Sequence, residues 1–132
     1  MVETTSTDPV TGIEYTTAEF EALRGMLDSE GIEWHDNSDE VFHRTQGEHK
    51  GRRFSAIFGY GSYGHERGYL EVRMDEDKPV GWLTATDALE WIAGVIDGWG
   101  AEQRAFENLR ESLAGNESNR APERLTDTVE VI

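Results

Sequence analysis

The sequence predicts an α+β domain in which an antiparallel sheet of four to five strands has helices on one face. Two segments, 16–30 and 84–97, place apolar residues at the three- and four-residue spacing of amphipathic helices. Between them, short runs rich in aromatic and β-branched residues are separated by polar turn residues. Consecutive short strands joined by short turns are typical of an antiparallel meander.

The first helix is expected to begin at Thr16, because Glu19 follows at the spacing of a capping box. Phe20, Leu23 and Leu27 give this helix one apolar face, and Gly31 supplies a C-terminal stop. The preceding residues, 1–15, are polar and rich in threonine, so we expect a flexible N-terminal arm.

Five short runs are the candidate strands of the sheet. They cover residues 32–34, 41–45, 53–60, 68–74 and, as an edge strand that follows a proline, 79–82. The polar run 46–51 and the acidic run 75–78 are expected to be turns.

The segment 79–98 is the most apolar of the chain and is expected to form the core helix. Thr84 and Asp87 have the spacing of a capping box, and Gly98 is the expected stop. Leu89, Ile92 and neighbouring apolar residues cover more than one face, so the helix should be buried on most sides.

A third helix is expected after Gly100 and before Gly115. Phe106, Leu109 and Leu113 recur at helical spacing and are the expected buried face, while the other positions are polar. Residues 116–132 predict a flexible C-terminal tail, although 128–132 alternates like an edge strand. The single domain is therefore expected to span 16–115.

Composition narrows the classes of function. The chain has 132 residues, no cysteine, and 27 acidic against 12 basic residues, which give a net charge of −15. The lack of cysteine excludes disulfides and thiolate chemistry and fits the cytoplasm, and no run is long and apolar enough to span a bilayer. A field this negative disfavours binding to nucleic acid or anionic membrane and favours basic partners, unless it serves solubility alone.

The run 59–64 matches the letters GxGxxG through Gly59, Gly61 and Gly64. A dinucleotide site needs a helix directly after the glycines, but the residues that follow alternate like a strand. We therefore expect a hairpin tip that exposes Tyr60 and Tyr63 as candidate contact residues.

No catalytic or metal-binding pattern stands out in the sequence. The serines lack a nucleophile elbow, and the carboxylates of the 75–77 turn are open to solvent, so an enzyme is not expected. The four histidines, His35, His43, His49 and His65, have no helical metal spacing. Neither a metal nor another cofactor is predicted.

Charge is strongly segregated along the chain. Residues 1–40 contain eleven acids and one base, residues 41–73 contain a majority of bases, and residues 74–100 are acidic again. The segregation favours an acidic surface that pairs with a basic groove on another protein. Its candidate residues are Asp28, Glu30, Glu33, Asp36, Asp39, Glu40, Asp75, Glu76 and Asp77, with Tyr60, Tyr63 and Trp99 as anchors.

The run 23–34, LRGMLDSEGIEW, followed by aromatic strands and by Leu83-Thr84 at a helix start, resembles small acidic proteins of actinobacterial phages and mobile elements. In those proteins an L-R-x-L-L-D-x-x-G-x-E-W helix leads into a small antiparallel sheet, and the likeness covers about residues 20–93. The size and acidity also resemble anti-CRISPR and anti-restriction proteins.

These observations predict a phage-derived inhibitor in the host cytoplasm that binds the basic nucleic-acid channel of a defence complex, such as a CRISPR effector. One alternative is a sponge that binds a small molecule or nucleotide signal. The phosphates of the ligand would contact Arg52, Arg53 and Arg67 and the glycines Gly59, Gly61 and Gly64. Another alternative is a homodimeric adaptor in which Trp91 and Val95 face a second copy.

Overall fold

The computed structural model describes residues 5–7, 14–40, 42–59 and 61–120. Its centre is an antiparallel sheet with the strand order β3-β4-β5-β6-β7. The strands are β3 (Trp34–Asp36), β4 (Phe42–His49), β5 (Arg52–Gly59), β6 (Leu70–Met74) and β7 (Val80–Leu83). The predicted α+β class and antiparallel meander are confirmed.

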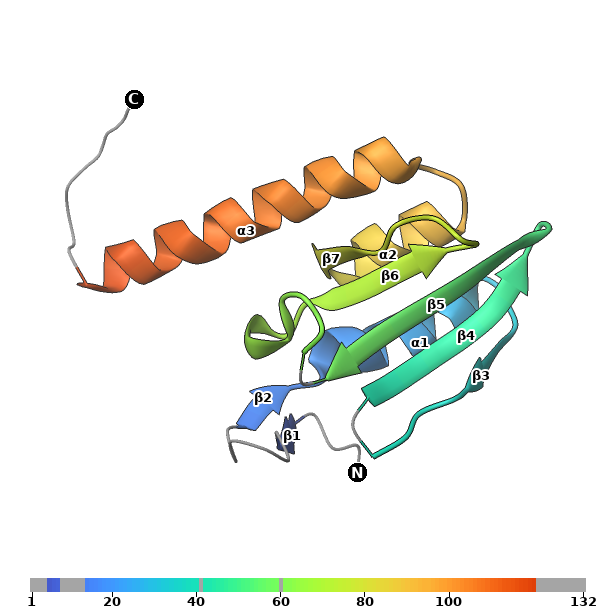
Figure 1. The fold of residues 1–132 in the computed structure, drawn as a ribbon, viewed down its shortest axis with the longest axis horizontal. Coiled ribbons are helices and arrows are strands. Elements are labelled where there is room, and N and C mark those ends of the chain that lie inside the picture. Colours follow the sequence, from blue (N-terminus) through green and yellow to red (C-terminus); the bar gives the residue numbers. More distant parts are fainter. Residues whose placement is uncertain (1–4, 8–13, 41, 60, 121–132) are drawn as a thin grey trace.

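Three helices accompany the sheet (Figure 1): α1 (Ala18–Ser29), α2 (Ala85–Ile92) and α3 (Gly98–Arg120). Helices α1 and α2 contact each other and cover one face, whereas α3 packs along β7 and α2. A short 3-10 helix, η1 (His65–Arg67), lies between β5 and β6. None of the helices in the described ranges could cross a membrane.

The core lies between the sheet and the two helices. Phe20, Leu23 and Leu27 of α1 are fully buried against alternate residues of β5 and β6, as the apolar periodicity predicts. Trp91 of α2 is also in this core and is 2% exposed, so it does not face a second copy.

The capping box of α2 is confirmed in full. The Thr84 hydroxyl accepts from the Asp87 N–H, and the Asp87 carboxylate accepts from the Thr84 N–H. The predicted end of this helix is wrong, because α2 stops at Ile92 and Gly94 takes the left-handed conformation, with φ at 87°. Gly94 and Gly98 are both suitable stop residues, and the chain uses the earlier one.

The predicted cap of α1 is also wrong. The N-cap is Thr17, whose side chain makes no capping hydrogen bond, and the Thr16 hydroxyl accepts from the Ala18 N–H. The Glu19 carboxylate accepts instead from the Ala85 N–H at 2.7 Å. This side chain therefore ties α1 to the first turn of α2.

The polar run 46–51 is mostly strand. β4 continues to His49, and the turn is Lys50-Gly51 with φ angles of 53° and 80°, the pattern of a tight two-residue hairpin. Gly47 lies so close to the Glu33 carbonyl and the Phe54 ring that no Cβ would fit. The missing side chain lets β3 lie close against β4.

The chain termini differ from the predicted arm and tail in part. Within the arm, β1 (Thr5–Thr7) and β2 (Glu14–Thr16) form a two-stranded antiparallel ladder. Within the tail, residues 116–120 belong to α3, and the candidate strand 128–132 lies outside the described residues.

Candidate functional site

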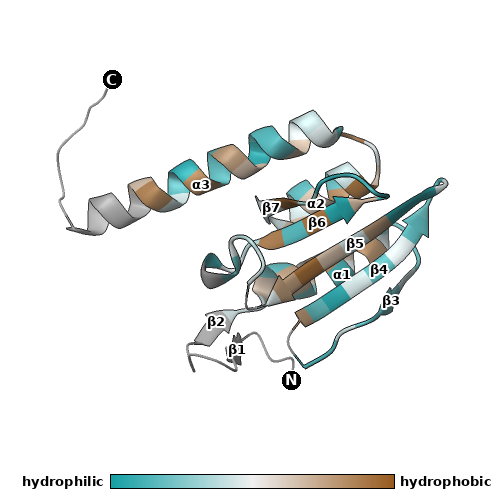
Figure 2. Cartoon of the chain, viewed as in Figure 1, coloured by the Kyte–Doolittle hydropathy of each residue, from teal (hydrophilic) through white to brown (hydrophobic). Residues whose placement is uncertain are grey.

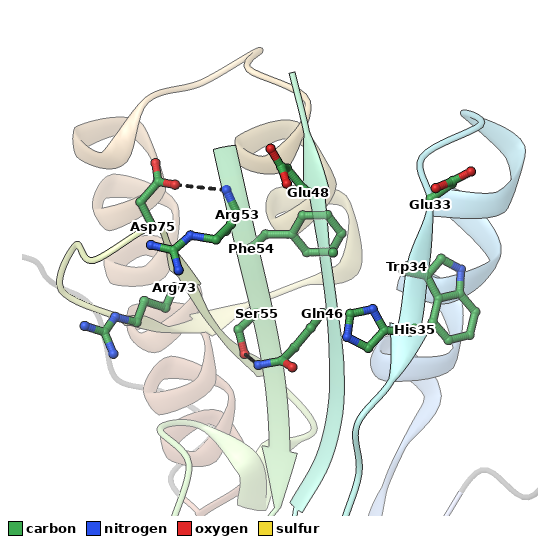
Figure 3. Close-up of a pocket in the computed structure, with 11 residues that line it drawn as sticks. Glu33, Trp34, His35, Gln46, Glu48, Arg53, Phe54, Ser55, Arg73 and Asp75 are labelled. Carbon is green, nitrogen blue, oxygen red and sulfur yellow. Dashed lines mark hydrogen bonds between the residues drawn. The ribbon is translucent and has the colours of Figure 1, made fainter. Parts of the chain in front are cut away.

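The face of the sheet opposite α1 and α2 carries a row of polar side chains. The strand register places His35 opposite Gln46, Gln46 opposite Ser55, and Ser55 opposite Arg73. The Gln46 amide donates a hydrogen bond to the Ser55 hydroxyl at 3.4 Å, and Figure 3 shows the row crossing from β3 to β6. These residues lie on one face because residues directly opposite each other on neighbouring strands point to the same side of the sheet.

A pocket of about 750 Å³ lies over this row. Arg53 and Arg73 stand on its β5–β6 side, and Glu33 and His35 stand on its β3 side (Figure 3). Its full lining is Glu33, Trp34, His35, Gln46, Gly47, Glu48, Arg53, Phe54, Ser55, Arg73 and Asp75. The pocket therefore has arginines on its β5–β6 side and Glu33 on its β3 side. The Asp75 and Glu48 carboxylates lie near Arg53, and neutral donors and acceptors lie in the middle.

Both pocket arginines form exposed ion pairs with Glu76, and Arg73 Nε also donates a hydrogen bond to the Asp77 carbonyl at 2.9 Å. Arg53 Nη2 is 2.9 Å from Glu76 Oε2, and Arg73 Nη2 is 3.6 Å from Glu76 Oε1. The side chains of Arg53 and Glu76 are 63% and 79% exposed. Such pairs are worth about 0–1 kcal/mol, so a ligand anion can replace Glu76 at little cost.

The arginines and glycines of the predicted phosphate site do not converge. Arg52 and Arg53 begin β5, whereas Gly59 ends it, and a strand of this length spans about 20 Å. Gly61 and Gly64 follow in the loop with φ near 90°, and exposed Arg67 ends η1. The glycines shape this connection: the buried Ser62 hydroxyl bonds both the N–H and the C=O of Gly59.

The sequence does not predict His35, Gln46, Ser55 and Arg73 as a group. Its polar run 46–51 indicates a turn, whereas Gln46 lies within β4. Once β4 and β5 are known to be joined by the two-residue turn at 50–51, their register follows, and the row can be read from the sequence.

The three predicted partner-binding acids of the 75–77 turn are all occupied by the chain's own arginines. Asp75 accepts from the Arg53 N–H and from Arg52 Nε, both at 2.9 Å, and these two hydrogen bonds lower the pKa of Asp75. Asp77 lies 3.5 Å from Arg52 Nη2, and Glu76 pairs as described above. The 75–77 turn therefore holds the start of β5 against the end of β6 instead of presenting unpaired negative charge.

The acids between 28 and 40 are divided. Hydrogen bonds from the Ser38 side chain and N–H, with help from Arg24, lower the pKa of Asp36 to about 2. Asp28 accepts from Trp34 Nε1 at 2.9 Å, and Asp39 accepts from the Phe42 N–H at 2.8 Å. Of these acids, Glu30, Glu33 and Glu40 are exposed and form no side-chain hydrogen bond or ion pair with the rest of the described chain.

Of the predicted aromatic anchors, Tyr63 is 63% and Trp99 is 68% exposed, whereas Tyr60 lies outside the described residues. The histidines are dispersed: His43 packs against the Phe20 and Phe58 rings, and His65 Nδ1 lies 2.8 Å from the Ser62 carbonyl oxygen. Within the described ranges, no three histidine or acidic side chains meet in a geometry suited to a metal ion.

Comparison with protein-family models, curated proteins and solved structures finds no match to this chain. The likeness to phage proteins therefore stays a prediction from the sequence.

Proposed function

We propose that this protein binds a small anionic ligand of the phosphorylated-nucleotide class in the pocket on the open face of its sheet. The observation that carries the proposal is the row from His35 to Arg73 beneath a pocket of about 750 Å³. Pockets of roughly 300–1,000 Å³ are the usual size for small-molecule sites. This proposal keeps the sponge hypothesis but moves its site away from the glycine loop.

The chemistry of the pocket suits a ligand with two different ends. The planar guanidinium groups of Arg53 and Arg73 suit bidentate contacts to phosphate oxygens. Gln46 and Ser55 offer neutral donors and acceptors, and Glu33 and Glu48 suit the amino group of a base or another donor. The Ser55 hydroxyl is hydrogen-bonded to Gln46 and not to a histidine, which favours binding over nucleophilic catalysis.

The test is thermal unfolding and calorimetry with a panel of mono- and dinucleotides, in the wild type and in Arg53→Gln/Arg73→Gln. We expect one class of nucleotide to raise the wild-type midpoint, since a ligand at one hundred times its Kd adds about 2.7 kcal/mol. The double variant should lose this response.

Arg52→Gln is the matched control. Arg52 precedes Arg53 on the same strand and pairs with the same acidic turn, yet it does not line the pocket. A response lost equally in Arg52→Gln, or no wild-type response to any nucleotide, would contradict the proposal.

A second proposal is that the protein inhibits a host defence complex by binding its basic channel. The observation that favours it is the exposure of Glu30, Glu33 and Glu40 without internal partners, in a chain of net charge −15. These glutamates form an acidic edge, with Glu30 and Glu33 before β3 and Glu40 past its other end, beside the start of β4. The acidic edge is smaller than the surface that the sequence predicts, because the 75–77 turn is occupied by arginines.

A further inference from the structure

The helix α3 has two faces of opposite character. Its inner face contacts β7 and α2 through small or polar residues: Ala101 is fully buried, and the Asn108 amide donates to the Trp82 carbonyl at 2.7 Å. Its outer face exposes Trp99, Phe106 and Leu113, which are 68%, 57% and 55% exposed. The prediction that Phe106 and Leu113 form the buried face is therefore wrong.

The three exposed residues form a regular stripe. Each follows the previous one by seven residues, so successive members lie within about 20° of each other around the helix. Figure 2 shows apolar bands recurring along α3 between polar ones, and Figure 1 shows the helix continuing past the end of β7. A heptad stripe on a projecting helix is the pattern of a helix that packs against another helix.

We propose that two copies of this chain associate through this stripe, with their α3 helices antiparallel and the two Phe106 rings meeting at the two-fold axis. Residues equally far from Phe106 along α3 then come level across the interface. Trp99 lies seven residues before Phe106 and Leu113 seven after, so the largest ring of one copy meets the smaller leucine of the other. The stripe is self-complementary, as an interface between identical chains requires.

The charged residues beside the stripe select the antiparallel arrangement. Glu102 lies four residues before Phe106 and Arg110 four after, so each glutamate comes level with an arginine of the other copy. The Arg110 guanidinium already lies 5.8 Å from the centre of its own Phe106 ring, which keeps this cation beside the stripe. A parallel pair would instead place the two Glu102 carboxylates opposite each other, which is unfavourable.

The net charge of the chain sets the response of the dimer to salt. Each copy has a net charge of −15, so two copies repel each other at long range while the stripe attracts them through apolar contact. Added salt screens the repulsion. Association should therefore strengthen with ionic strength, whereas binding of a basic partner to the acidic edge should weaken.

The first experiment is sedimentation equilibrium of the full chain over a concentration series at low and high salt, with Phe106→Glu as the disrupting variant. We expect a monomer–dimer equilibrium that shifts toward dimer in high salt and a tenfold or greater rise in the dissociation constant for Phe106→Glu. Val95→Glu is the matched control, because Val95 is 69% exposed and precedes α3, outside the stripe. A wild type that stays monomeric at the highest soluble concentration, or equal loss in both variants, overturns the proposal.

The second experiment tests the orientation by charge reversal. Glu102→Arg and Arg110→Glu should each weaken the dimer severalfold, because each variant brings like charges level with each other. The double variant Glu102→Arg/Arg110→Glu should regain wild-type association, since it restores opposite charges at both positions. Failure of the double variant to recover, with the circular dichroism spectrum unchanged, overturns the antiparallel arrangement.

Discussion

The two faces of the sheet contain residues from the same strands but have opposite roles. On β5, Phe54, Ala56 and Phe58 are buried beneath α1 and α2, whereas Arg53 and Ser55 line the open pocket. The helical face is apolar and filled, and its register is fixed because a slip by one residue would expose its aromatic rings. The open face carries charges and hydrogen-bonding groups that contribute little to this packing.

The contrast between the two faces shows where a functional site is compatible with this fold. Residues on the helical face are constrained by volume, so their substitution changes stability first. Residues on the open face are constrained weakly by the fold, so residues such as Gln46 and Ser55 are free to bind a ligand. Substitutions on the helical face should therefore destabilise the protein more than substitutions on the open face.

The largest effect is expected for Phe58→Ala. Phe58 is fully buried, and its ring centre lies 6.3 Å from that of Phe20 and 6.2 Å from that of His43. Removal of the ring leaves a cavity between α1 and the sheet, so we expect a loss of about 3–5 kcal/mol in the free energy of unfolding, measured by denaturant titration. Ile57→Ala removes a half-buried side chain from the open face of the same strand and should lower the free energy of unfolding by about 1 kcal/mol. Equal losses would mean that the two faces are not different in kind.

A smaller loss is expected for Asp87→Asn, at the junction of the helical face with α3. The Asp87 carboxylate is buried beside Arg104 Nη1 at 2.9 Å and the Asn108 amide at 2.8 Å, and it completes the cap of α2. Burial opposes ionisation, but the hydrogen bonds from Asn108, Arg104 and Thr84 outweigh it and lower the pKa of Asp87. The side-chain amide of an asparagine would place an N–H donor against the donors of Asn108, Arg104 and Thr84. We therefore expect about 2 kcal/mol of destabilisation near pH 7.

The acid dependence of Asp87→Asn gives a second readout. A carboxylate with a lowered pKa contributes stability above its unfolded value near 3.8 and loses it as the pH falls toward the folded value. The gap between wild type and variant should therefore narrow in acid. Glu90→Gln is the control, because the Glu90 side chain is 31% exposed and its carboxylate pairs with Arg104 alone among the described residues. This substitution should cost less than about 1 kcal/mol. A gap that is constant with pH would show that Asp87 acts through shape alone.

Most of the helical face could be predicted from the sequence, because its signals are local. The apolar stripe of Phe20, Leu23 and Leu27 and the Thr84–Asp87 capping box each need only a few neighbouring residues, and both are confirmed. The end of α2 could not be predicted, since Gly94 and Gly98 offer equal stop signals and packing decides between them.

The open face and α3 were harder, because their arrangement depends on residues far apart in the sequence. A polar strand such as β4 does not alternate between apolar and polar residues, so its sequence resembles that of a loop. On α3, the tight approach to β7 and α2 selects Ala101 and Asn108 as the inner face. No periodicity within α3 could have shown that its larger apolar residues remain outside.

The smallest effect on stability is expected for the acidic edge. Reversal of Glu30, Glu33 and Glu40 to lysine removes no described hydrogen bond or ion pair, so the free energy of unfolding should change by less than about 0.5 kcal/mol per site. If the acidic edge binds a basic channel, capture of a defence complex from host lysate at low salt should be lost. Reversal of Asp97, Glu107 and Glu111, which changes the net charge equally on other exposed surfaces, should reduce capture only modestly. Equal loss from both triple variants would mean that net charge attracts the partner and that the acidic edge has no special role, because a specific interface responds to the position of its charges.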